Sequence, residues 1–177
     1  MSKSRYANLG PYYHGYASVL LKDYAVGQKT LSLLAPFSDP VFGNHARYLL
    51  ARTHHLADER AEASTHYEGT ISDHAKARAA AVELLKQPQK FNNDAETRNQ
   101  LESLVKNPPP DHVARATFYM GVLQYEAGRF GDAKTRFTEF IKQFPQASLK
   151  LEAEIRLGYC QVQLKEYADA IKTLTPL

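Results

Sequence analysis

The chain has 177 residues, of which 44% are hydrophobic and 23% charged, so it can bury a core and has a globular composition. Its net charge of +3, with no dense cluster of lysine and arginine, does not indicate a nucleic-acid-binding protein. The single cysteine, Cys160, excludes an internal disulfide. No apolar run approaches the roughly 20 residues that cross a bilayer, so we expect no membrane span.

Helices are predicted along the first third of the chain, with breaks at proline and aspartate. A first helix is expected over about 11–23 and a second over about 25–35. Pro36 and Pro40 separate this pair from a helix over 41–56, whose inner residues recur at helical spacing.

The middle of the chain leaves two interpretations open. After a turn at Asp58, residues 60–72 and 73–86 are rich in helix formers, and neither glycine nor proline separates the two segments. One continuous helix is therefore an option. Asp73 can cap a new helix, and we expect a break there.

Two possible helix caps and a run of prolines divide residues 94–127 into helices. Asp94 can cap a short helix that ends near Lys106, and Asp111 can cap a helix over 112–127. Between them, residues 107–110 read Asn-Pro-Pro-Pro, which is extended rather than helical. This run is either a rigid spacer between helices or a docking segment for a proline-recognising module.

A spacing pattern recurs along the chain, counted from a small residue on a helix. From Gly121, a turn glycine follows at +7, an aromatic residue at +9, alanine at +12 and an aromatic residue at +16. Related orders start at Gly158, Ala51 and Gly15, and the four anchors are 36, 70 and 37 residues apart. Because 70 is close to twice 35, one diverged copy is expected between the second and third anchors. The residues at +9, +12 and +16 are Tyr24, Gly27 and Leu31; Arg60, Ala63 and Tyr67; Phe130, Ala133 and Phe137; and Tyr167, Ala170 and Leu174.

The pattern has a simple physical interpretation. Small residues such as Gly121 and Ala133 let two antiparallel helices approach closely, while Phe130 and Phe137 fill the space around the contact. A helix pair of this kind cannot bury its apolar face alone, so it stacks on its neighbours.

The pattern resembles the tetratricopeptide repeat family, and its sequence motif is similar to that of bacterial tetratricopeptide-repeat proteins of the cell envelope. The best match covers Gly121 to Pro145, whereas Lys165 stands where the turn glycine is common. The resemblance implies an all-α, right-handed superhelix of antiparallel helix pairs with a concave groove, and generally no catalysis. We expect a single domain over 1–177, with repeats at about 8–39, 44–74, a diverged 75–110, 114–147 and an incomplete 151–177.

The two ends of the sequence suggest expectations about the cellular compartment and about the length of the parent chain. The first ten residues lack the apolar segment of a signal peptide. The compartment is therefore cytoplasmic by default, or the periplasm or envelope if an upstream signal peptide was removed. The last residues, TLTPL, stop where a second helix should still continue, which predicts a fragment of a longer chain.

No catalytic or metal-binding motif is evident. Metal ligands on a helix favour i and i+4 spacing, and although His66 and His74 could share a face, no cysteine or paired carboxylate completes a set. We expect these histidines to be structural or solvent-facing, with no metal and no cofactor. Cys160 has no candidate base in the sequence and is expected to be inert. The histidines of this region are His45, His54, His55, His66 and His74.

Several tyrosines and arginines fall on the first helices of the pairs, away from the small residues. In the family that the chain resembles, first helices line the groove. Tyrosine and arginine are enriched where proteins bind each other, so these residues either form a binding groove or pack between repeats and face solvent. The lysines and asparagines of a carboxylate-clamp subtype are absent. The candidates are Tyr12, Tyr16, Tyr48, Arg52, Tyr125, Arg156 and Tyr159.

We therefore expect a non-enzymatic scaffold that binds a peptide or protein partner in its groove, and no nucleic acid. The alternative is a structural module that stacks on itself, or on the rest of its own chain, without a groove ligand.

Overall fold

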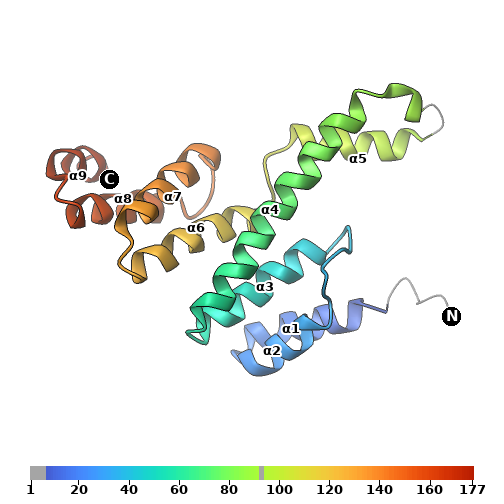
Figure 1. Cartoon of the computed structure of the whole chain (residues 1–177), viewed down its shortest axis with the longest axis horizontal. Helices are drawn as coiled ribbons and strands as arrows, with labels where there is room; N and C mark the ends of the chain where they lie inside the picture. Colours follow the sequence, from blue (N-terminus) through green and yellow to red (C-terminus); the bar gives the residue numbers. More distant parts are fainter. Residues whose placement is uncertain (1–6, 92–93) are drawn as a thin grey trace. The chain divides into compact units, whose positions relative to one another are not determined.

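The structure of the chain, a computed structural model, describes residues 7–91 and 94–177. All regular secondary structure in these residues is helical, which confirms the all-α fold class (Figure 1). The chain divides into two compact units, Met1–Thr70 and Ile71–Leu177. The single domain and the repeat boundaries expected from the sequence stay predictions.

The first unit consists of two helix pairs. α1 packs against α2, and both pack against α3. The Asp23 carboxylate caps α2 by accepting a hydrogen bond from the backbone N–H of Val26 at 3.2 Å. The helices are α1 (Leu9–Leu20), α2 (Tyr24–Ser32), α3 (Gly43–Leu56) and the first part of α4 (Arg60–Leu85).

The helix α4 is continuous, so the expected break at Asp73 is wrong. Once a helix has formed, each added residue gains one hydrogen bond at little further cost. The segment 73–85 is rich in alanine and ends in two leucines, and both residue types favour continuation. The capping tendency of one aspartate does not outweigh these residues.

The second unit contains the rest of α4 and all later helices. The Arg78 guanidinium on α4 donates to the Val105 carbonyl of α5 at 2.6 Å. Asp94 caps α5 as predicted, since its carboxylate accepts from the Thr97 N–H at 2.9 Å. Asp111 was expected to cap α6 but is its first residue, and Pro110 holds the cap position. The elements are a 3₁₀ turn, η1 (Pro88–Phe91), α5 (Ala95–Lys106), α6 (Asp111–Glu126), α7 (Phe130–Gln143), α8 (Lys150–Gln163) and α9 (Tyr167–Leu174).

The spacing pattern has the same structural meaning in each pair. Residues at +12 are buried in all four copies. Each second helix begins at +9, with Tyr24, Arg60, Phe130 or Tyr167. Each turn residue at +7 is left-handed: φ is 62° at Lys22, 61° at Asp58, 73° at Gly128 and 62° at Lys165.

Close approach of the paired helices occurs where the pattern predicts it. A Cβ atom at Gly121 would lie 2.8 Å from Cε1 of Phe137, and one at Gly15 would lie 2.5 Å from Cγ of Leu31. Both distances are too short for a real carbon, so only glycine fits the observed packing. The same relation joins Gly158 to Leu174.

The core of the second unit joins three helices. Phe118 of α6, Phe137 and Phe140 of α7, and Ala153 and Cys160 of α8 belong to one buried cluster. A first helix therefore packs on the preceding pair, as the stacking argument requires. No helix in the described part of the chain has both the length and the apolarity to cross a membrane.

Candidate functional site

Each first helix carries a stripe of four residues on one face. Counted from the small residue, these positions are −6, −3, +1 and +4, and steps of three and four keep residues on one helical face. Six of the seven predicted site residues lie on these first-helix stripes, and Arg156 lies beside one. The stripes are Leu9, Tyr12, Tyr16 and Val19 on α1; His45, Tyr48, Arg52 and His55 on α3; Arg115, Phe118, Val122 and Tyr125 on α6; and Glu152, Ile155, Tyr159 and Val162 on α8.

The stripes of α1 and α3 meet at His45. The Tyr12 hydroxyl lies 2.7 Å from Nδ1 of His45, a short hydrogen bond. The Tyr12 ring also stacks on Phe42, with 4.8 Å between ring centroids. Tyr16 presents its ring at a steep angle to His45, at 5.9 Å. Burial, followed by the neighbouring Tyr13 and Tyr16, raises the pKa of Tyr12, so this hydroxyl remains a donor.

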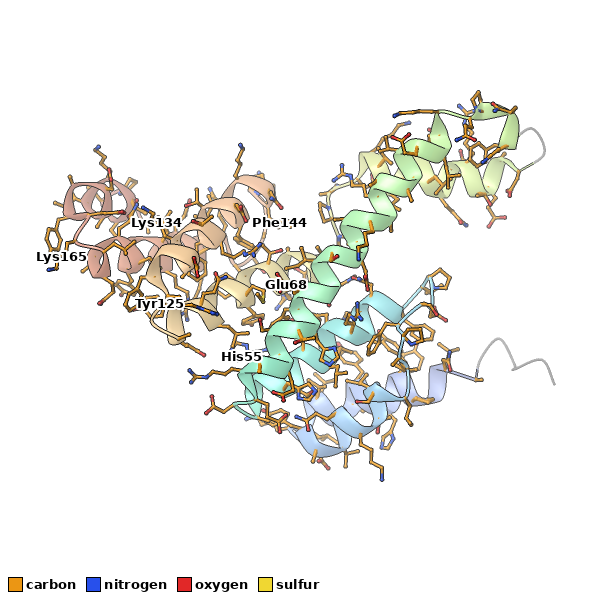
Figure 2. All side chains as sticks on the ribbon, in the orientation of Figure 1. His55, Glu68, Tyr125, Lys134, Phe144 and Lys165 are labelled. Atoms are coloured by element: carbon orange, nitrogen blue, oxygen red, sulfur yellow. The ribbon has the colours of Figure 1, made fainter. Side chains whose placement is uncertain are left out.

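The network continues from α3 to α4. The ring of Tyr48 lies 6.1 Å from that of Tyr67, which is fully buried. The Tyr67 hydroxyl is 3.3 Å from Nδ1 of His55, and Nη1 of Arg52 is 3.4 Å from the same nitrogen. Figure 2 labels His55 among these side chains. Contacts between rings and polar tips thus connect two first helices with a second helix.

Exposure separates the members of this network into two groups. Tyr16 is 38% exposed, whereas Tyr48 is only 7% exposed. Tyr48 therefore packs inside the network, while part of the Tyr16 side chain is open to solvent. The helices α1 and α3 contain no aspartate or glutamate, although α3 contains Arg47 and Arg52. The first helices of this unit thus combine aromatic, imidazole and guanidinium groups without a carboxylate of their own.

The predicted site residues of the second unit each contact different neighbours, and among the described residues they form no network like that of the first unit. Tyr125 packs edge-on against Phe130, at 5.2 Å between centroids, and so fixes the start of α7. The Arg156 guanidinium lies 5.9 Å from the Phe118 ring and 2.9 Å from the Glu152 carboxylate. Tyr159 is 52% exposed. Of these residues, Tyr159 offers most surface.

Sequence reasoning missed three members of the network: His45, His55 and Tyr67. The signal that would have found them is the repeat register, because His45 and His55 occupy −6 and +4 from Ala51. Tyr67 is the +16 residue of the same pair, and its hydroxyl provides the link to His55.

The remaining histidines and the cysteine have structural surroundings. The rings of His54 and His66 stack at 5.5 Å, and Nδ1 of His54 lies 2.6 Å from the Glu59 carboxylate. Burial, with smaller contributions from His54 and Arg47, lowers the pKa of His66. Within the described ranges, no three histidine, cysteine or acidic side chains are placed to hold a metal ion. Burial raises the pKa of Cys160 to about 11, so its thiol stays protonated at neutral pH.

These features define a helical-repeat protein assembled from antiparallel helix pairs. Residues 115–147, which include all of α7 and most of α6, match the model of a known family, the tetratricopeptide repeat. This part of the chain is therefore a tetratricopeptide repeat, as its spacing pattern predicted. None of the curated proteins compared with the chain matches. Repeats of this family generally act as non-catalytic modules for protein interaction; the bacterial and envelope association stays a prediction.

Proposed function

We propose that the chain is a non-catalytic scaffold whose first-helix stripes bind a peptide or protein partner. The observation that carries this proposal is the connected network on α1 and α3, which joins Tyr12, Tyr16, His45 and Arg52 through ring contacts and hydrogen bonds. Aromatic and arginine side chains present large contact areas with few rotatable bonds, so they lose little entropy on binding.

The chemistry of the stripes favours a partner that supplies oxygen acceptors. Tyrosine hydroxyls and the Arg52 guanidinium are hydrogen-bond donors, and α1 and α3 contain no carboxylate. An extended segment with backbone carbonyls and acidic side chains fits this pattern. In the second unit, Tyr159 and Arg156 on α8 are a separate candidate binding face.

The experiment selects peptides of about 12 residues from a random library against the whole chain and compares their affinities for matched variants. The double variant Tyr16→Ala with Arg52→Ala should weaken binding about tenfold or more, since a tenfold loss corresponds to about 1.4 kcal/mol. A second double variant, Tyr125→Ala with Arg156→Ala, tests the other unit in the same way.

The matched control is Tyr13→Ala with Lys29→Ala. It also removes one tyrosine and one cation, but both residues are exposed and lie off the stripes. Equal affinities for the wild type and the stripe variants, or an equal loss in the control, would reject these faces as the binding site.

A further inference from the structure

Two histidine rings stack between α3 and the first part of α4, which lie side by side (Figure 1). The ring centroids of His54 and His66 are 5.5 Å apart, and the ring planes are inclined by only 12°. Phe37, from the segment between α2 and α3, packs at a steep angle against His66, with 6.0 Å between centroids. The Arg47 guanidinium of α3 lies over the same phenyl ring, 5.1 Å from its centroid. We call His54 and His66 the stacked histidines.

One carboxylate lies beside the stacked histidines. The Glu59 carboxylate is 2.6 Å from Nδ1 of His54, and it accepts a second hydrogen bond of 2.6 Å from the Gln28 amide of α2. Because a carboxylate only accepts, the Nδ1 atom of His54 carries a proton. A positive charge on this ring therefore has a counter-charge next to it, but the same carboxylate is already engaged when the second ring takes up a proton.

The surroundings of His66 disfavour a proton. The Arg47 side chain crosses from α3 to α4, since a Cβ atom at Gly69 would lie 2.6 Å from its Nη1. Burial lowers the pKa of His66, and the neighbouring His54 and Arg47 lower it further. Glu62, one turn earlier on α4, acts in the opposite direction, and its effect is the smallest of the four. A protonated His66 would thus face a guanidinium and a second imidazole ring together.

The contact around Glu59 recurs between the last two helix pairs. Glu59 stands at +8 of its pair and accepts from Gln28, at +13 of the preceding pair. Glu166, also at +8, accepts from Lys134, also at +13, at 2.7 Å. We call each of these contacts between successive pairs a seam. The two seams have the same hydrogen-bonded frame.

The two seams differ in their histidines. The residue at +3 is His54 in the first seam and Gln161 in the second. The residue at +15 is His66 in the first seam and Thr173 in the second. Successive pairs of this chain therefore pack with neutral side chains at both positions, and the second seam is an internal reference for the first.

The first seam gives stability a definite direction with pH. In the unfolded chain a histidine binds a proton near pH 6.5, whereas in the folded chain the pKa of His66 is lower. Between these two values the unfolded state holds more protons, so the free energy of unfolding falls as the pH falls. Above both values the ring is neutral in either state, and the full stability is present.

We propose that the stacked histidines form an acid-sensitive latch, which holds α4 against α3 at neutral pH and loosens below a pH of about 6.5. The part of α4 that loosens includes Tyr67, whose hydroxyl lies 3.3 Å from Nδ1 of His55 on the α3 stripe. Acid would therefore also weaken partner binding by that stripe. This consequence rests on the proposed function, whereas the latch itself does not.

Hydrogen exchange of the whole chain, read by mass spectrometry at about pH 7.5 and about pH 5.5, tests the latch. After correction for the intrinsic pH dependence of exchange, residues 60–69 should exchange about threefold to tenfold faster at the lower pH. The upper limit is the effect of one proton that only the open state binds. The reference is the segment 130–174, which contains the second seam and no histidine and should show no comparable change.

His66→Gln should remove most of this acceleration, since no titrating ring remains at that position. The matched control is His14→Gln, the same change at an exposed histidine of α1 in the same unit, and it should keep the wild-type response. Each variant is compared with itself at the two pH values, so a loss of stability common to both cancels. Circular dichroism checks that each variant folds.

His54→Gln is a second, independent variant, which gives the first seam the residue of the second. Its response should be smaller than that of the wild type, although burial and Arg47 still act on His66. The proposal is overturned if residues 60–69 and 130–174 respond equally in the wild type, if either His54→Gln or His66→Gln keeps the full response, or if His14→Gln loses it. Exchange is measured without a partner, so peptide binding and the latch can fail independently of each other.

Discussion

At the scale of single residues, the turn inside each helix pair shows a local conflict. Lys165 has a φ of 62°, although left-handed backbone costs a residue with a Cβ roughly 1 kcal/mol or more. Its hydrogen bonds match those of the turn at Gly128: the residue at +7 donates to the carbonyl at +4, and the next residue donates to the carbonyl at +3. Packing of the two helices thus imposes the turn, whichever residue occupies it.

Lys165→Gly should therefore raise the free energy of unfolding by about 0.5–1 kcal/mol. Glycine relieves the backbone strain of the folded state, and the greater entropy of glycine in the unfolded chain offsets part of this gain. Gly128→Ala should lower the free energy of unfolding by about 1 kcal/mol, because it places a residue with a Cβ in the left-handed turn. Urea unfolding measures both. The control Lys142→Gly changes an exposed residue in the last turn of α7 and should lower stability by at most about 1 kcal/mol. A loss with Lys165→Gly would contradict the strain argument.

At the scale of helices, the sequence predicted the pairs because their determinants are local. The anchor at Gly121, the turn at +7 and the helix start at +9 all lie within ten consecutive residues of the sequence. The continuity of α4 could not be predicted in this way, because the capping tendency of Asp73 and the helix formers around it give opposite signals.

The candidate site was predictable only in part, for a related reason. Helical spacing predicted that Tyr12 and Tyr16 share one face of α1, and that Tyr48 and Arg52 share one face of α3. It could not show that Tyr48 is buried against Tyr67, since exposure depends on how α3 and α4 pack. Exposure and hydrogen bonds belong to tertiary structure, and the sequence pattern alone does not contain them.

Gly121→Ala tests the close approach of α6 and α7. The new methyl would lie 2.8 Å from the ring of Phe137, which is itself fully buried and has little room to move. We expect a loss of about 1–3 kcal/mol from overpacking. Gly131→Ala makes the same chemical change in α7 where no atom lies within 4 Å, so it should be neutral or stabilising by up to about 1 kcal/mol. Thermal unfolding of both variants compares them directly, and equal effects would refute close packing as the cause.

At the scale of the whole molecule, stability should be distributed unevenly. Helical repeats contact mainly their neighbours in sequence, so a perturbation weakens with distance along the chain. The two compact units each have buried residues of their own, such as Leu31 in the first and Phe137 in the second. The single domain expected from the sequence would instead unfold as one cooperative body.

Phe137→Ala distinguishes these behaviours. Removal of a fully buried ring should cost about 3–5 kcal/mol, because the side chain leaves a cavity among Phe118, Phe140 and Ala133. Hydrogen exchange read by mass spectrometry should then speed up in α6–α9 and change little in α1–α3. Leu31→Ala, equally buried but in α2, is the matched variant and should give the opposite distribution. If either substitution accelerates exchange equally in both units, the chain unfolds as one body and its repeats are coupled throughout.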